Sequence, residues 1–250
     1  MLRSFYIAST GMLVQRKKMD VITNNITNSE TTGYKKDQLL SRSFKDMMIA
    51  RINDPAVINI STPVGLQNTG VHIDEVITNF TQGNMEETGR LSDMAIEGSG
   101  FFAISTTAGE RYTRDGSFGV NSQGYLVTAD GNYVQGENGR ILVGSSKFSI
   151  DGQGNVTVNG ASAGKLKIVT FADSAGLRKE GNNLYYNYNT SAVANGQYNV
   201  KQGFLEGSNI DIAQEMVDMM AVSRTYDTNQ RMVKMIDETL SKTVNDVGRV

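Results

Sequence analysis

Apolar residues recur at alternating spacings of three and four near the beginning of the chain. The series contains Phe5, Ala8, Met12, Gln15, Met19, Ile22 and Ile26. Only Gln15 is polar, and the charged Arg16, Lys17, Lys18 and Asp20 fall on the opposite side. This heptad spacing predicts an amphipathic helix that packs against another helix.

The last forty or so residues follow the same rule. Their apolar series contains Ile212, Met219, Val222, Tyr226, Val233, Ile236, Leu240 and Val247, and it is interrupted by Glu215, Asn229 and Thr243. No proline follows Pro63 and no glycine lies between Gly207 and Gly248, so nothing breaks a helix here. The pattern predicts a second long helix over about residues 210–246.

The C-terminal helix has a second apolar flank formed by Met216, Met220, Met232 and Met235. Its apolar surface is therefore wider than a single two-helix seam requires. Methionine suits packing against slightly different neighbours, although it also serves as plain core filler. The favoured hypothesis is that this surface contacts other subunits. The alternative is a stalk in which the two terminal helices of one chain pack only against each other.

Between the ends, short β-prone runs such as FFAIS, NVTVN and LKIVTF are separated by Asp-Gly and Asn-Gly dipeptides. These dipeptides favour tight hairpins, so residues 80–207 are predicted to form an all-β domain with an antiparallel sheet, sandwich or partly closed barrel. Residues 47–79 contain both prolines and little periodicity, and are predicted to be an extended linker with some β pairing. The expected class is α+β, in which residues 1–46 and 208–250 form a discontinuous, coiled-coil-like helical core domain.

Composition removes several classes of function. The chain of 250 residues has 24 Lys plus Arg against 26 Asp plus Glu, so no basic field favours a nucleic-acid partner. Cysteine is absent, which excludes disulfides and thiolate chemistry. The start MLRSFYIASTGMLVQRKK is a poor signal peptide, and no apolar run reaches the ~20 residues of a membrane helix. No membrane insertion and no cleaved signal peptide are expected.

Candidate chemistry is sparse. The single histidine, His72, lies between Val71 and Ile73 in an apparent strand, where a structural or exposed imidazole is favoured over a catalytic base. The tract DGQGN lacks the carboxylate that a calcium loop needs twelve residues along, where Ser162 stands. The tract EGSGFF lacks the third glycine of a dinucleotide fingerprint. No catalytic, cofactor-binding or metal site is predicted, and the chain is not expected to be an enzyme.

Three stretches together resemble a known family. They are the N-terminal helix ending in TTGYK, the central QGNMEETGRLSDMAIEGSGFFAIS followed by YTRDGSFGVNSQGYLVTADG, and the closing QGFLEGSNIDIAQEMVDMMAVSRTYDTNQRMV. Their order and content resemble the bacterial flagellar rod and hook axial proteins. The chain is too short for a typical hook protein, and the tract PVGLQNTGV resembles a feature of the distal rod members, to which the chain is most similar; proximal rod and hook-like members are the alternatives.

The resemblance implies a structural subunit that is exported through the flagellar type III apparatus without a cleaved signal. It implies folding on assembly into a helical tube in the periplasm, where the tube transmits torque from motor to hook. The expected partners are copies of the same chain, other rod and hook axial proteins, and the surrounding basal-body rings. It also implies that residues 47–79 pack between subunits and stiffen the rod. A secreted β-rich binding module on a helical stalk is the alternative from another class, and an enzyme ranks third.

The end of the first helix is expected to set the register of these contacts. Asn24, Asn25 and Asn28 lie beside the apolar stripe, where their amides can pair with each other, with backbone or with a neighbouring subunit. Gly33 permits a positive φ that turns the chain away, and Tyr34 anchors the departure. We therefore predict that subunit contacts involve these five residues together with Met216 and the apolar residues of both terminal series except Val247.

Overall fold

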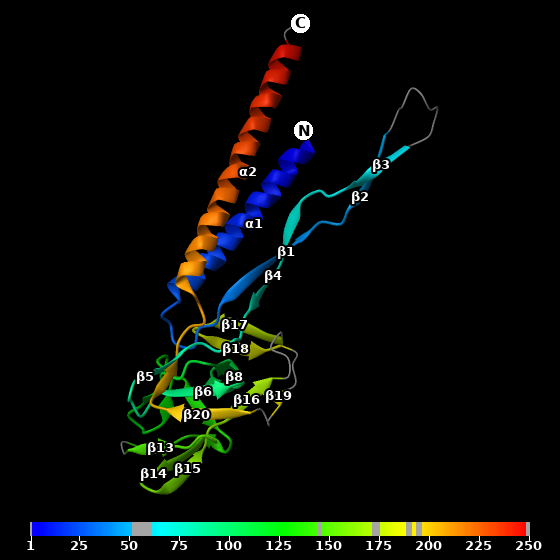
Figure 1. The fold of residues 1–250 in the computed structure, drawn as a ribbon. Coiled ribbons are helices and arrows are strands. Elements are labelled where there is room, and N and C mark those ends of the chain that lie inside the picture. The colour runs from blue at the N-terminus through cyan, green and yellow to red at the C-terminus, as the bar shows by residue number, and fades with distance from the viewer. Residues whose placement is uncertain are drawn as a thin grey trace. The chain divides into compact units, whose positions relative to one another are not determined.

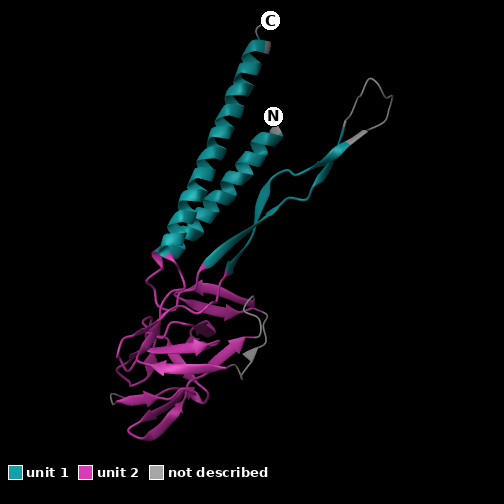
Figure 2. Cartoon of the chain, viewed as in Figure 1, with its two compact units in different colours: residues 1–26, 37–77, 212–250 teal, residues 27–36, 78–211 magenta. Residues whose placement is uncertain are grey.

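The computed structural model describes residues 2–51, 62–144, 147–171, 176–188, 192–193 and 197–248. The chain forms two compact units (Figure 2). The helical unit comprises Met1–Ile26, Asp37–Ile77 and Ile212–Val250, and the β unit comprises Thr27–Lys36 and Thr78–Asp211. The α+β class is confirmed. The domain boundaries expected at residues 46/47, 79/80 and 207/208 stay a prediction, and the two compact units divide the chain at other residues.

Two long helices form at the predicted places, α1 over Leu2–Thr27 and α2 over Ile212–Val247. Glu215 lies in the first turn of α2, where a carboxylate interacts favourably with the helix dipole. Within the helical unit the two helices run side by side in opposite directions (Figure 1). Asn25 contacts Glu215 and Gly11 lies beside Asn229. Because each pair of positions is separated by two heptads on both helices, the antiparallel register is the same at both contacts.

The helical unit also contains two strand pairs, so the segment expected as a partly β linker is largely paired. Strand β1 (Asp37–Ser43) pairs with β4 (Val71–Thr78). Strand β2 (Met47–Arg51) pairs antiparallel with β3 (Thr62–Gln67), with a register shift between Ile49 and Ala50. Pro55 lies outside the described residues.

The β unit is built from short strands, and the described strands pair antiparallel with their neighbours. The strands are β5 (Met85–Glu87), β6 (Met94–Gly98), β7 (Phe101–Thr106), β8 (Gly109–Thr113), β9 (Gly119–Val120), β10 (Leu126–Val127), β11 (Tyr133–Gly136), β12 (Gly139–Arg140), β13 (Phe148–Ile150), β14 (Asn155–Val158), β15 (Ala161–Lys165), β16 (Ile168–Phe171), β17 (Leu177–Gly181), β18 (Leu184–Asn187), β19 (Ala192–Val193), β20 (Tyr198–Gln202) and β21 (Phe204–Glu206). The largest sheet follows the order β17-β18-β8-β7-β11-β10-β9, and β20 and β21 return from late in the sequence to pair with β6 and β5. The unit therefore closes only with the residues that directly precede α2.

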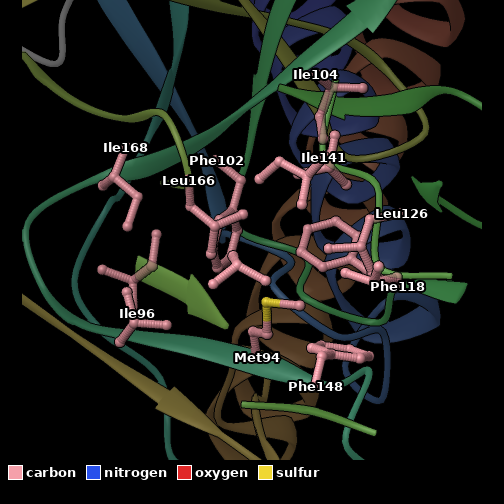
Figure 3. Close-up of a cluster of buried hydrophobic side chains, with 14 residues drawn as sticks. Met94, Ile96, Phe102, Ile104, Phe118, Leu126, Ile141, Phe148, Leu166 and Ile168 are labelled. Carbon is pink, nitrogen blue, oxygen red and sulfur yellow. The ribbon is translucent and has the colours of Figure 1, made fainter. Parts of the chain in front are cut away.

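The apolar side chains of these strands and of the segments that connect them form one main core (Figure 3). Its fully buried members include Phe102, Ile104, Leu126 and Leu166, and Phe118 packs edge-on against Phe102 with ring centroids 5.1 Å apart. Burial of these apolar side chains stabilises the β unit.

Most of the predicted turn dipeptides lie in hairpin connections, but one does not. Asn159-Gly160 is a two-residue connection between Val158 and Ala161, which pair across the turn. Asp115-Gly116 instead lies where Ser117 bridges to Asp93. At this position the dipeptide lies at a long-range contact. Its local turn chemistry is the same as in a hairpin, so the sequence alone did not distinguish the two cases.

Candidate subunit-interaction surface

Where α1 and α2 meet along a seam, Asn25 lies opposite Glu215 and Gly11 lies opposite Asn229. Of the apolar residues of the two helices, Ala8, Val14 and Ile22 of α1 and Val222 of α2 are buried, and Val14 is not a member of the predicted series. Other members of the two predicted series are only partly buried: Met12, Met19, Ile26, Met219, Tyr226, Val233, Ile236 and Leu240. The side chain of Val247 lies outside those described. One antiparallel partner thus leaves much of the seam partly open to solvent.

A buried polar cluster fixes the seam at one end. The Asn25 side-chain amide donates to the backbone carbonyl of Asp37 at 2.9 Å and to the Glu215 carboxylate at 3.2 Å. Its carbonyl oxygen accepts the Asp37 backbone N–H at 3.0 Å. Asn25 and Glu215 are both 1% exposed. A buried amide with three directed partners defines the relative position of α1, β1 and α2 better than an apolar contact would.

A second contact lies two heptads away, where Gly11 allows a close approach of the helices. A Cβ at Gly11 would lie 3.1 Å from the side-chain nitrogen of Asn229. Two of the three polar residues that interrupt the α2 series, Glu215 and Asn229, therefore lie opposite α1. The third, Thr243, is exposed and donates to the carbonyl of Thr239.

The other sides of α2 present apolar side chains to solvent. Near its start, Ile212, Met216, Val217 and Met220 are 40% to 54% exposed, and we call these four residues the α2 patch. Further along, Met232 and Met235 are 47% and 58% exposed, beyond a charged stretch that includes Asp227 and Arg231. At about 3.6 residues per turn, the four methionines occupy the part of the circumference that the α1 seam does not use.

Exposed apolar residues also lie on α1 and on the strand pairs. Phe5 and Tyr6 are 42% and 51% exposed, and Leu13 is 60% exposed. The β2–β3 pair exposes Met47, Met48, Val64 and Leu66 by more than half. Four of these side chains lie together on the β2–β3 pair, and clustered apolar exposure of this kind marks interaction sites.

An aromatic group attaches the strand pairs to α1 within the helical unit. The ring of His72 stacks on Phe44 with centroids 4.9 Å apart, and Phe44 contacts Tyr6 at 6.5 Å. Gly70 lies against Thr10, and Arg3 donates to Gln67 at 3.0 Å. These contacts explain His72 as a packing residue of the strand pair.

A buried ion cluster closes the β unit, and sequence analysis missed it. Lys35 donates to one oxygen of Glu206 at 2.5 Å and to the carbonyl of Thr81 at 2.8 Å. Arg114 donates to the other oxygen of Glu206 at 3.2 Å. The Lys35 and Glu206 side chains are fully buried. The cluster therefore joins the segment after α1 to the strand that precedes α2.

Burial shapes the protonation of this cluster. Desolvation lowers the pKa of Lys35, the carboxylate of Glu206 opposes the shift, and nearby Arg114 adds to it. Desolvation also lowers the pKa of Arg114, again against the attraction of Glu206. Lys35 and Arg114 both pair with the carboxylate of Glu206, so loss of that carboxylate would leave two buried cations without a partner charge.

The predicted turn after α1 forms, and its residues belong to the β unit. Gly33 has φ 66° and donates its N–H to the Glu206 carbonyl at 2.7 Å, and an added Cβ would lie 2.4 Å from the Asp115 nitrogen. Tyr34 is buried, with the Lys179 ammonium 3.7 Å from its ring centroid. Asn28 is partly buried beside Thr31. These residues anchor the chain within its own β unit.

The predicted contact residues thus fall into three groups. Those enclosed within the chain are Ala8, Ile22, Asn25, Gly33, Tyr34 and Val222; those partly open are Met12, Met19, Ile26, Asn28, Met219, Tyr226, Val233, Ile236 and Leu240; those exposed are Phe5, Asn24, Ile212 and Met216. Sequence analysis did not include Leu13, Val217 or the β2 methionines. A hydrophobic residue outside the heptad series is the signal that could have found them.

Within the described residues, no group of three or more His, Asp or Glu side chains is placed to hold a metal ion. None of the helices described has both the length and the apolar character needed to cross a membrane.

Comparison with known proteins agrees with this architecture. Residues 5–35 match the family model for flagella basal body rod proteins, residues 95–158 the D1 domain of flagellar hook proteins FlgE/F/G, and residues 201–246 the C-terminal segment of FlgEFG rod proteins. The chain is 38% identical to the flagellar basal-body rod protein FlgG of Bacillus subtilis, over 98% of this chain and 99% of the relative. It is 30% identical to the flagellar hook-basal body complex protein FlhO of the same species, over the whole of both chains. It is 31% identical to the basal-body rod protein FlgF of Caulobacter vibrioides, over 99% and 98%.

Terminal helices with open apolar surfaces on either side of an all-β segment, matched along the whole sequence, define a flagellar axial structural protein. The chain belongs to the flagellar basal-body rod protein family and is a structural subunit of the rod, not an enzyme.

Proposed function

We propose that this chain assembles with copies of itself into the distal part of the rod, as a helical tube that transmits torque from motor to hook. The observation that carries the proposal is the surface of α2. One side packs against α1, while the α2 patch and two further methionines remain exposed. A helix with apolar residues on two sides needs more than one partner.

A second copy is the partner that best fits these surfaces. The partly open seam and the α2 patch would be buried by terminal helices of neighbouring subunits in a coiled-coil-like core. A contact between different surfaces of identical chains generates an open helical filament when its rotation does not close. Other rod and hook axial proteins, which share the terminal motifs, would continue the filament at its ends.

Assignment to the distal rod rests on the tract PVGLQNTGV, which resembles a feature of distal rod members. The distal-rod-like tract PVGLQNTGV forms β3 and the turn into β4, where Asn68 donates to the Phe44 carbonyl at 2.7 Å and accepts the Gly70 N–H at 2.8 Å. We infer that this paired segment packs between subunits and stiffens the rod.

The proposed location follows from the family. The subunit would leave the cytoplasm through the flagellar type III apparatus without a cleaved signal peptide and join the rod in the periplasm, within the basal-body rings. No chemistry on a substrate is part of this function.

The test is a charge placed in the α2 patch. Met220→Asp should abolish filament formation by the purified chain and motility of cells that carry it, because a carboxylate cannot be desolvated there without a partner. The chain itself should stay folded by circular dichroism, since Met220 is exposed in the subunit. Gln230→Asp is the matched control, with the same added charge at an exposed polar position of α2. Normal assembly and motility of Met220→Asp would refute the proposed role of this surface.

A further inference from the structure

The methionines of this chain differ sharply in exposure. Met94 is fully buried in the β-unit core, whereas Met216, Met220, Met232 and Met235 of α2 are about half exposed. The chain has no cysteine, so no thiol within it competes for an oxidant. Exposed thioethers are therefore the most accessible oxidisable groups of α2.

We propose that Met216, Met220, Met232 and Met235 are oxidation sites through which a peroxide controls whether the free subunit can assemble. The inference rests on the proposed function, since it takes the α2 surface to be the one that neighbouring subunits cover. The effector it names is a small oxidant of the peroxide class.

The chemistry balances without further reactants. A lone pair of the thioether sulfur attacks one oxygen of hydrogen peroxide, the O–O bond breaks and an S–O bond forms. The sulfur loses two electrons and the peroxide gains them, and the departing hydroxide takes the proton from the oxygen now bound to sulfur and leaves as water. The product is methionine sulfoxide, which methionine sulfoxide reductases convert back to the thioether.

Oxidation at these positions should leave the free subunit intact. The four side chains face solvent, so a polar S–O group disturbs no packing inside the subunit. The same group would have to be desolvated when another helix covers it, which is unfavourable without a hydrogen-bond partner. Oxidation is therefore expected to act on assembly and not on the fold.

The order of events should also matter. Once neighbouring helices cover α2, its thioethers are removed from solvent, so assembled material is expected to resist the oxidant that inactivates free chains. Incorporation would be sensitive to peroxide, whereas the finished filament would not.

The experiment treats the purified full-length chain with graded hydrogen peroxide and locates each added oxygen by peptide mass spectrometry. The four α2 methionines should be oxidised before Met94, which serves as the internal reference. Circular dichroism should be unchanged. The critical concentration for filament formation should rise at least about tenfold. Methionine sulfoxide reductases should restore it.

Variants assign the effect to α2. A chain with Leu at positions 216, 220, 232 and 235 keeps apolar, helix-favouring side chains of similar volume but has no thioether there, so peroxide should not change its critical concentration from the value of the same variant before treatment. Met47→Leu with Met48→Leu is the matched control, which should stay sensitive because its α2 is unchanged. If the fourfold variant does not assemble, the two pairs 216/220 and 232/235 are replaced separately, and each should lower the sensitivity.

The outcomes separate the two proposals. Failure of the untreated chain to form filaments counts against the proposed function. Filaments from untreated chain, with equal assembly after the four thioethers have been shown to carry oxygen, overturn the oxidation proposal alone. Oxidation of Met94 before the α2 methionines overturns it as well.

Discussion

At the residue scale, Glu206 is the side chain on which the β unit depends most. It accepts from Lys35 and Arg114 and also from the Gly83 N–H at 3.0 Å. Lys35 and Arg114 come from segments far apart in the sequence, so a single buried carboxylate holds three parts of the chain. A buried pair with well-placed hydrogen bonds is costly to break because the remaining charge has no partner.

Glu206→Gln tests this dependence. The amide keeps the shape of the side chain but leaves two buried cations without a carboxylate, so the free energy of unfolding should fall by about 3–5 kcal/mol. The measurement is urea denaturation of the full chain followed by the near-ultraviolet dichroism of the β-unit tyrosines. Glu97→Gln is the control, because Glu97 is exposed and pairs with Lys201 at the surface; its midpoint should match that of the unmodified chain. A loss below about 1 kcal/mol for Glu206→Gln would contradict the essential role.

Tyr112 gives the β unit a pH dependence on the alkaline side. Burial, with the nearby carboxylate of Glu110, raises the pKa of Tyr112 from 10.0 to about 12. The folded chain holds this proton more tightly than the unfolded chain, so the contribution to stability is complete below pH 10 and is lost as the pH rises towards 12. Tyr112→Phe should therefore lose less stability than the unmodified chain between about pH 10 and pH 12. Equal losses in urea midpoints would show that Tyr112 ionises alike in both states.

At the element scale, the helices were predictable because their period is local. The spacing of three and four residues, with no glycine or proline in residues 210–246, was sufficient for α2. Many strands could also be predicted. The prediction of a hairpin turn at Asp115-Gly116 was wrong, because the same dipeptide can form a hairpin turn or lie at a long-range bridge. The polar interruptions of the α2 series predicted nothing by themselves. Their role became clear only from the structure, in which Glu215 lies opposite Asn25.

Asn25→Leu tests the polar cluster at the helix seam. The change removes the amide that hydrogen-bonds to the backbone of Asp37 and to the Glu215 carboxylate. The free energy of unfolding should therefore fall by about 1–3 kcal/mol. Amides in the first three turns of α2 should then exchange about tenfold faster or more in hydrogen-exchange mass spectrometry. Asn24→Leu is the matched control, since Asn24 is the exposed neighbour on the same helix. Unchanged exchange in Asn25→Leu would mean that apolar packing alone sets the register.

At the scale of the whole molecule, the two units differ in how much of themselves they bury. On α2, the buried side chains among those described are Glu215 and Val222, whereas the β unit has a continuous apolar core. This contrast was predictable, because the heptad spacing at both ends of the sequence gives way to short β-prone runs and glycine-containing turns between them. It could not show that residues 27–36 belong to the β unit, because Lys35 meets Glu206 only in three dimensions.

Hydrogen exchange on the purified subunit tests this division. Amides of Leu2–Ile26 and of Ile212–Val247 should exchange faster than those of the β-unit core, because helices with few buried contacts open more easily before neighbours cover them. Tyr34 and Lys35 should exchange slowly with the β unit, so protection should begin within residues 27–36, well before β5.

Assembly should then protect both helices while leaving the β unit unchanged, since folding of the ends is coupled to burial of their apolar surfaces by other subunits. Slow exchange throughout the free chain would instead favour a self-contained helical stalk. Fast exchange at Tyr34 and Lys35 would place these two residues outside the stable β unit. It would also show that the buried ion cluster does not hold residues 27–36 to that unit.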